Sequence, residues 1–233
     1  MPLKQTRSKL VCVLSDERGI TRQAAAARKQ GARLIELRAD LTGTPLPETA
    51  ALLKEIKKAS RLPVILTIRS KKEGGKFSGS ESQRLELFNS LIPSADLVDI
   101  ELSSRILKDV LKTARRRGKK VIISFHDFKG TPSASRLKNT LKSASAKKPD
   151  FVKIAACINQ PDDFARLADL LHFKHKSGPS VCIIPMVRKR AYRAFRLLAS
   201  ALGSGLSYAC LEGTVAPGQI PLREHAEFLQ NML

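Results

Sequence analysis

The stretch that decides the fold is Phe151–Cys157, Phe-Val-Lys-Ile-Ala-Ala-Cys, an apolar run typical of a buried β-strand with Lys153 inside it. An unpaired lysine is rarely buried, because removing an ammonium group from water costs free energy. That cost falls if the amine is neutral, and a neutral amine is a nucleophile toward carbonyl groups. The preceding apolar run, Val121–Phe128, contains His126 near its end. A lysine and a histidine on successive strands together suggest Schiff-base chemistry with an acid/base partner.

The sequence on either side repeats one pattern, in which apolar, β-branched runs alternate with amphipathic segments. Each apolar run predicts a strand, and the strands are expected to begin near Leu10, Leu34, Val64, Leu97, Val121, Phe151, Val181 and Leu206. The amphipathic segments predict helices over Ile20–Gln30, Pro47–Lys57, Ser80–Ile92, Ser103–Arg117, Ser133–Lys147, Asp162–Lys174, Tyr192–Leu202 and Pro221–Leu233. Strand–helix alternation at this period is typical of parallel βαβ units.

Eight such units are the number in a (β/α)8 TIM barrel, so an α/β fold of this kind is expected. The alternative is an open, doubly wound sheet. Such folds bind nucleotides at a Gly-x-Gly-x-x-Gly motif after the first strand, and this chain has none there. No linker or shift of composition divides the chain, so residues 1–233 are expected to form one domain.

The formal net charge of +21 is extreme for 233 residues. Such a balance can attract nucleic acid or an anionic membrane, or steer a small anionic substrate. The basic clusters lie in different segments, and the chain has no Trp and only two Tyr. The interleaved aromatic residues that stack on single-stranded nucleic acid are therefore missing, and no specific nucleic-acid partner is expected.

No apolar run is long enough to span a membrane, and no apolar segment with a cleavage site follows the basic N-terminus. The four cysteines, Cys12, Cys157, Cys182 and Cys210, all fall in predicted strands, which favours buried thiols over disulfides. The chain contains no Cys-x-x-Cys pair, so no structural zinc site is expected. Together these features predict a cytoplasmic protein with no membrane partner and no metal.

Five consecutive predicted strands carry polar residues on the face that would point into the barrel. These residues are Glu36, Arg38, Asp40, Thr67, Arg69, Asp99, Glu101, Ser124, His126 and Lys153. Apolar residues normally fill the interior of a barrel, and catalytic groups gather at the carboxyl ends of its strands. Any one of these residues could belong to a buried salt-bridge network that only closes the barrel. Their coincidence at one end favours a lined pocket instead.

Two loops on that same face could act as lids, Glu73–Gly79 after the third strand and Thr214–Gln219 after the eighth. Gly203–Gly205 precedes the eighth strand and belongs to the opposite face. The other histidines lie in predicted polar or terminal helices and are expected at the surface; they are His172, His175 and His225.

These motifs together resemble the type I 3-dehydroquinate dehydratase family. The matching segments follow the family's order and spacing over nearly the whole chain: Glu36-Leu37-Arg38-Ala39-Asp40, Thr67-Ile68-Arg69 followed by Lys72-Glu73-Gly74-Gly75, Ser124-Phe125-His126-Asp127-Phe128, Val152-Lys153-Ile154-Ala155 and Ala216-Pro217-Gly218-Gln219. The resemblance implies a syn dehydration of 3-dehydroquinate to 3-dehydroshikimate, the third step of the shikimate pathway, with no metal and no cofactor.

The resemblance also implies roles for individual residues. Lys153 matches the lysine that forms an imine with the substrate ketone, His126 matches the general acid/base, and Glu73 matches an acidic residue beside that histidine. The positions matched to substrate binding are Glu36, Arg38, Arg69, Arg196, Gln219 and Thr214. The partner implied is a small anionic substrate, and the oligomeric state stays open, with a homodimer as one alternative.

The chain departs from the family pattern in three places. Tyr192 and Phe195 stand where members usually have a glycine and a serine, so Arg193 or Arg190 could replace Arg196 as the carboxylate ligand. Val215 stands where the lid commonly has a serine. Only about nine residues precede the first strand, so the N-terminal hairpin that often caps the barrel floor is expected to be reduced or absent.

Two other functions remain open. A class I aldolase or transaldolase would use the same lysine, although many of those enzymes also need a phosphate site after strands seven and eight, where this chain has Ala-Pro-Gly-Gln. A non-enzymatic barrel could use its positive charge to bind polyanions, with binding that weakens steeply as salt rises.

Overall fold

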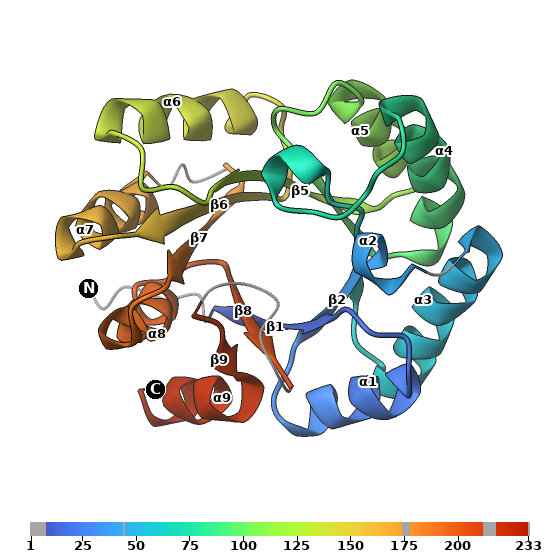
Figure 1. Ribbon diagram of the computed structural model, residues 1–233, viewed down its shortest axis with the longest axis horizontal. Helices are drawn as coiled ribbons and strands as arrows, with labels where there is room; N and C mark the ends of the chain where they lie inside the picture. Colours follow the sequence, from blue (N-terminus) through green and yellow to red (C-terminus); the bar gives the residue numbers. More distant parts are fainter. Residues whose placement is uncertain (1–7, 44, 174–177, 212–217, 233) are drawn as a thin grey trace.

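The computed structural model describes residues 8–43, 45–173, 178–211 and 218–232, and it confirms the α/β barrel (Figure 1). The strands are β1 Lys9–Leu14, β2 Leu34–Arg38, β3 Val64–Thr67, β4 Leu97–Glu101, β5 Lys120–Asp127, β6 Phe151–Ile158, β7 Ser180–Val187, β8 Leu206–Cys210 and β9 Ile220–Pro221. The α-helices are α1 Ile20–Lys29, α2 Ala39–Thr42, α3 Leu46–Ser60, α4 Glu81–Leu91, α5 Leu107–Arg116, α6 Ala134–Ser145, α7 Pro161–Ala168, α8 Ala194–Ala201 and α9 Leu222–Asn231. Short 3-10 helices are η1 Lys71–Glu73, η2 Ile92–Ser94, η3 Asp169–His172 and η4 Arg190–Tyr192.

All paired strands are parallel, in the order β7-β6-β5-β4-β3-β2-β1-β8-β9, and the helices lie outside the ring (Figure 1). Among the described residues, β7 and β8 share no ladder. The ring is closed there by single hydrogen bonds: the Gly205 amide donates to the Val181 carbonyl (2.9 Å) and the Ile183 amide to Ser204 Oγ (3.0 Å). A side chain at Gly205 would collide with the Ser180 hydroxyl, so glycine permits this close approach.

The strands separate two apolar layers, as their period of two requires. On β6, Val152, Ile154 and Ala156 face the helices, whereas Phe151 and Ala155 face the inside of the barrel. The interior layer consists of Val11, Val13, Leu34, Ile65, Leu97, Ile122, Phe151, Ala155, Cys182, Ile184, Met186, Leu206 and Tyr208. Lys153 lies between Phe151 and Ala155 on the same inward face.

Among the expectations for cysteine and histidine side chains, several are confirmed and the one for His225 is wrong. All four cysteines are buried and none is in a disulfide, and His172 is exposed. His225 is not at the surface: it is 1% exposed on α9, and its Nε2 lies 2.7 Å from Ser200 Oγ. That hydroxyl also contacts Ser207 Oγ (2.6 Å), so buried hydroxyls from α8 and β8 give Nε2 a polar partner, whereas Nδ1 has no hydrogen-bond partner among the described residues.

Two further expectations fall on residues that the structure does not describe: His175, and the reduced N-terminal hairpin, which would involve residues 1–7. Within the described ranges, no helix is long and apolar enough to cross a membrane.

Candidate active site

Lys153 lies at the centre of the site and is only 5% exposed. Its Nζ is 2.5 Å from Asp99 Oδ2 on β4 and 3.8 Å from Glu36 Oε1 on β2, so two carboxylates face one ammonium group. The same Nζ lies 4.6 Å from the centre of the Tyr208 ring on β8. Buried charge requires such partners, and this lysine therefore does not reach out to solvent at the barrel mouth.

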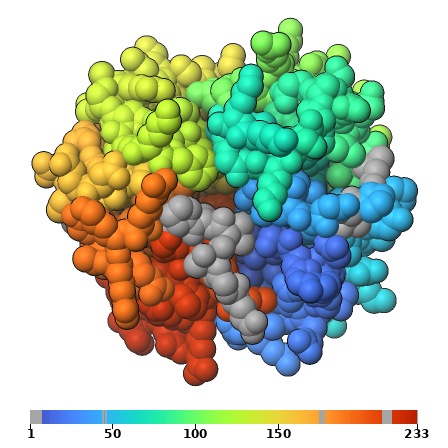
Figure 2. Space-filling view, in the orientation of Figure 1, coloured from blue at the N-terminus to red at the C-terminus, as the bar shows by residue number. Residues whose placement is uncertain are grey.

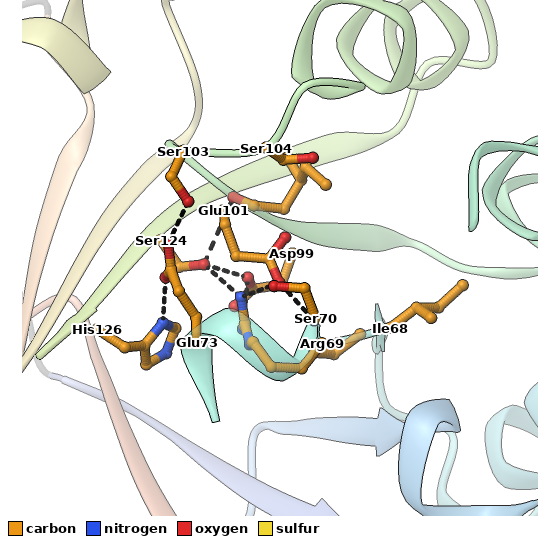
Figure 3. A network of polar contacts seen from close by, with 12 residues as sticks. Ile68, Arg69, Ser70, Glu73, Asp99, Glu101, Ser103, Ser104, Ser124 and His126 are labelled. Carbon is orange, nitrogen blue, oxygen red and sulfur yellow. Dashed lines mark hydrogen bonds and ion pairs between the residues drawn. The ribbon is translucent and has the colours of Figure 1, made fainter. Parts of the chain in front are cut away.

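Asp99 links Lys153 to Arg69, which follows β3. Arg69 donates to Asp99 Oδ1 (2.7 Å) and to Ser124 Oγ on β5 (2.7 Å), and Ser124 itself donates to Asp99 Oδ1 (2.6 Å). Burial raises the pKa of Asp99, but the charges of Arg69 and Lys153 outweigh burial, so the pKa lies far below its ordinary value. Asp99 is thus held as an anion between two cations, and Figure 3 shows it beside one of them, Arg69.

Glu36 occupies the other side of Lys153. It is buried, and its Oε1 accepts a hydrogen bond from Thr67 Oγ1 on the neighbouring strand at 2.7 Å. The register pairs Glu36 with Ile65 and Arg38 with Thr67, so Thr67 sits one pleat further along β3 and reaches back to the carboxylate. The hydroxyl orients Glu36 toward the lysine.

His126 and Glu73 form the second pair that the sequence predicted. His126 Nδ1 lies 2.9 Å from Glu73 Oε2, and Ser103 Oγ donates to Glu73 Oε1 at 2.5 Å (Figure 3). Burial lowers the pKa of His126, and the nearby charges of Arg69 and Lys153 lower it further, so the imidazole is neutral at pH 7. Burial raises the pKa of Glu73, although the bond from Ser103 acts against it.

The turn after β3 sets the position of Glu73. The 3-10 helix η1 ends at Gly74, whose φ of 77° is a left-handed conformation that suits glycine. A side chain at Gly74 would also collide with the Phe128 ring, which stacks on His126 with ring centres 6.1 Å apart. The glycine therefore lets this turn close onto the end of β5 and bring Glu73 to His126.

A buried ion pair supports the site from outside. Arg84 on α4 donates to both carboxylate oxygens of Glu101 (3.0 and 2.8 Å) and to the Ile68 carbonyl (3.0 Å). Glu101 Oε1 also lies 3.5 Å from Arg69 and accepts from the Ser70 amide (2.8 Å). Burial raises the pKa of Glu101, but Arg69 and Arg84 lower it below its usual range. This network fixes the segment that carries Arg69.

Arg38 is held by its own neighbour. Its Nε and a terminal nitrogen donate to the two oxygens of Asp40, each at 2.8 Å. Asp40 belongs to α2 instead of continuing β2, because the chain turns into a helix immediately after Arg38. The predicted alternation along this strand is therefore wrong at Asp40, which clamps Arg38 at the rim.

The site residues surround one cavity of about 90 Å³. Eight of the nine predicted residues line it: Glu36, Arg38, Arg69, Glu73, His126, Lys153, Arg196 and Gln219. The ninth, Thr214, lies outside the described residues, as does Val215. The segments after β3 (teal) and β7 (orange) stand around the centre of this face (Figure 2).

Of the three arginines considered for the substrate carboxylate after the seventh strand, Arg196 is the one that lines this cavity, from the buried side of α8. Burial lowers its pKa to about 10. The two alternatives lie elsewhere: Arg190 is exposed on η4, and Arg193 pairs with Glu224 at 3.6 Å.

Sequence reasoning assigned no role to four residues of the site. The sequence signal for Asp99 was its two-residue spacing from Glu101 on β4, which places both on the inward face. Tyr208 has the same spacing from the inward-facing Leu206 on β8. The Tyr208 hydroxyl is buried without a hydrogen-bond partner among the described residues, and burial beside Glu36 and Asp99 raises its pKa. Arg84 and Ser103 reach the site only through contacts distant in sequence.

No group of three potential metal ligands occurs within the part of the chain that the structure describes. The charged groups around Lys153 are instead cations and carboxylates that are already paired with one another. The arrangement can accept, hold and return protons around a buried amine.

Comparison with known proteins shows the family of this chain. Residues 10–232 match the type I 3-dehydroquinase family. The 3-dehydroquinate dehydratase of Methanosarcina acetivorans is 40% identical over 213 residues, covering 88% of this chain and 87% of that protein.

Two crystal structures share the fold. The Aquifex aeolicus 3-dehydroquinate dehydratase superposes with a TM-score of 0.84 at 33% identity, covering 96% of this chain and 98% of that one. The Clostridium difficile type I enzyme, described with covalently modified comenic acid, has a TM-score of 0.86 at 25% identity and covers 97% and 92%. The chain is a hydro-lyase that belongs to the type I 3-dehydroquinase family.

Proposed function

We propose that this protein dehydrates 3-dehydroquinate to 3-dehydroshikimate by syn elimination through a Schiff base on Lys153. The observation that carries the proposal is a buried amine with carboxylates at 2.5 and 3.8 Å, on the strand beside the one that bears His126. The names of the relatives give the substrate, and the residues around the cavity supply the groups that the chemistry needs.

The first stage is imine formation. Lys153 gives up a proton, and its amine adds to the substrate ketone; loss of one water then leaves a protonated imine. Asp99 faces the same nitrogen and stabilises its positive charge before and after this step. His126, neutral at pH 7, accepts and returns the protons that addition and water loss require.

The second stage is elimination. The protonated imine withdraws electrons, so the adjacent C–H becomes acidic, and His126 takes that proton to leave an enamine. The enamine expels the hydroxyl of the neighbouring carbon, which leaves as water with a proton from His126. Hydrolysis of the new imine consumes one water, frees Lys153 and releases the conjugated ketone.

The roles of the other residues follow from what they contact. Glu73 accepts the Nδ1 proton of His126 and so leaves the Nε2 lone pair for proton transfer. Arg69 donates to Asp99 and Ser124 and also lines the cavity, so its charge both orders the site and faces the space for substrate. Arg196 lines the cavity and is suited to the substrate carboxylate, with Arg38, Glu36 and Gln219 facing the same space.

The test is to trap the intermediate. The protein is incubated with 3-dehydroquinate and borohydride, and intact mass and peptide mapping locate any adduct. A ligand-sized mass increase on the Lys153 peptide, together with conjugated-enone absorbance in the unreduced reaction, is expected. An adduct on another lysine would refute the role of Lys153, and carbon–carbon cleavage products would favour the aldolase alternative.

A further inference from the structure

The amino-terminal end of the barrel, opposite the active site, contains a second and larger cavity of about 840 Å³. It opens where the strands begin. Lys9 is the first residue of β1 and Lys120 the first of β5, while Arg33 immediately precedes β2. The buried side chains of Leu34, Leu97 and Phe151 form its base.

The charges around this cavity are unbalanced. Among the described residues, five cations but only one carboxylate, Asp96, line it; the cations are Lys9, Arg33, Lys57, Arg61 and Lys120. Lys57 is paired with Asp96 at 2.9 Å, and Asp96 also accepts from the Val64 amide, so each oxygen of this carboxylate already has a partner. The other four cations form no ion pair within the described ranges.

The arrangement in the ring places these cations on different sides of the cavity. In the eight-strand order β1 and β5 are opposite one another, so Lys9 and Lys120 extend from opposite walls. Arg33 stands beside β1, and Arg61 lies in the α3–β3 turn with φ of 53°. Like charges around a concave surface raise its positive potential, because the low-dielectric walls focus the field.

We propose that this amino-terminal cavity, which we call the floor site, binds a polyphosphate anion. A single phosphate would engage one or two of the cations, whereas a chain of phosphates can contact arginine and lysine on both walls. The apolar bottom of the cavity, formed by Leu34, Leu97 and Phe151, would accept a planar nucleobase attached to that phosphate chain. The shared chemistry is the phosphate chain, either free or as part of a nucleoside triphosphate.

The floor site is separate from the catalytic machinery. No described residue lines both this cavity and the one around Lys153. Phe151 lies two residues before Lys153 on β6 and belongs to the interior apolar layer of the barrel. This layer separates the floor site from the Lys153 cavity. Occupancy of the floor site therefore does not depend on the Schiff-base mechanism, and the proposal goes beyond the proposed function.

The test is calorimetric titration of the full chain with ATP and, separately, with inorganic tripolyphosphate, at low and at moderate ionic strength. The Lys9→Gln/Lys120→Gln variant removes one cation from each wall. Lys108→Gln/Lys112→Gln makes the same change of net charge on exposed residues of α5 that do not line the cavity. Dehydratase turnover is measured on all three proteins.

The wild type is expected to bind saturably at one site. The Lys9/Lys120 variant should bind at least about tenfold more weakly, the α5 variant should bind as the wild type does, and all three should turn over equally. Equal binding of both ligands supports recognition through phosphate alone, and tighter binding of ATP supports a contribution from the apolar base. Absence of saturable binding, or equal weakening in the α5 variant, overturns the proposal.

Discussion

The two ends of this barrel use charge in opposite ways. At the carboxyl end Lys153, Arg69 and Asp99 are almost completely buried, and the two cations lie 2.5 and 2.7 Å from the oxygens of Asp99. At the amino end Lys9 and Lys120 are exposed and without ion pairs among the described residues. Burying charge opposes folding unless every partner is present, whereas solvated charge is nearly neutral for stability. Substitutions at the carboxyl end should therefore affect chemistry strongly, and those at the floor only ligand binding.

The largest effect is expected for Lys153→Ala. It removes the one lysine that lines the described cavity, so no imine can form, and turnover should fall by about 10⁴-fold or more. Because the variant also removes one of the two cations beside Asp99, Lys153→Arg is the matched control: it keeps a cation at this position but cannot form an imine. Steady-state turnover and circular dichroism check both. Turnover within tenfold of wild type in either variant would refute the Schiff-base proposal.

His126→Ala should have the next largest effect. Without this base, proton transfers around the imine slow, and turnover should drop by about 10²- to 10⁴-fold. Lys153 remains, so the covalent adduct should form slowly and accumulate, which intact-mass measurements without borohydride can detect. His172→Ala changes an exposed histidine on η3 and should behave as the wild type. A His126 variant that turns over normally, or that never forms an adduct, would contradict the assignment.

The buried network was visible in the sequence to the extent that it repeats with the strand period. Glu36, Asp99 and Lys153 each occupy an inward position among apolar neighbours, and parallel strands bring such positions to one end. The strand positions were predictable for the same reason. The period fails where the chain leaves the strand: Asp40 starts a helix instead of extending β2.

Other features depend on contacts that no local pattern encodes. Arg84 reaches Glu101 from a neighbouring helix 17 residues away, and Ser103 meets Glu73 across 30 residues. His225 is buried because α9 packs beside α8, where Ser200 provides its partner. The amphipathic pattern of α9 predicted the helix correctly but did not show that a polar position would face a buried serine.

His225 should make stability depend on pH. Burial, with a smaller effect of Arg196, lowers its pKa to about 4 from an ordinary value near 6.5. The unfolded chain therefore takes up the proton first as pH falls, so stability is complete above about pH 6.5 and is lost toward pH 4. Between pH 7 and pH 5 this histidine should account for a loss of roughly 2 kcal/mol in the free energy of unfolding.

Denaturant unfolding of the wild type and of His225→Gln at both pH values checks this expectation. The variant should lose about 2 kcal/mol less than the wild type between pH 7 and pH 5, although it starts from a lower stability. His172→Gln, the exposed counterpart, should lose as much as the wild type. Parallel losses in the wild type and the His225 variant would mean that His225 does not resist protonation in the folded state.

The smallest effect is expected for Ser103→Ala. This substitution tests whether a residue that does not line the cavity influences the buried charges at the carboxyl end of the barrel. Ser103 donates to Glu73 Oε1 at 2.5 Å, while the other oxygen, Oε2, holds His126. This bond stabilises the Glu73 carboxylate, so its loss should raise the pKa of Glu73 further above the usual range. Glu73 would then be protonated at higher pH and would release His126 sooner as the solution is acidified.

Turnover of Ser103→Ala near neutral pH should therefore fall only about fivefold, in line with one hydrogen bond to a charged group at a partly solvated position. The diagnostic readout is the pH profile, whose acid limb should move to higher pH. Ser103→Thr keeps the hydroxyl and should restore the wild-type limb. A fall in turnover with an unmoved acid limb would mean that Ser103 supports the loop after β4 without tuning Glu73, and that the buried charges function independently of the shell around them.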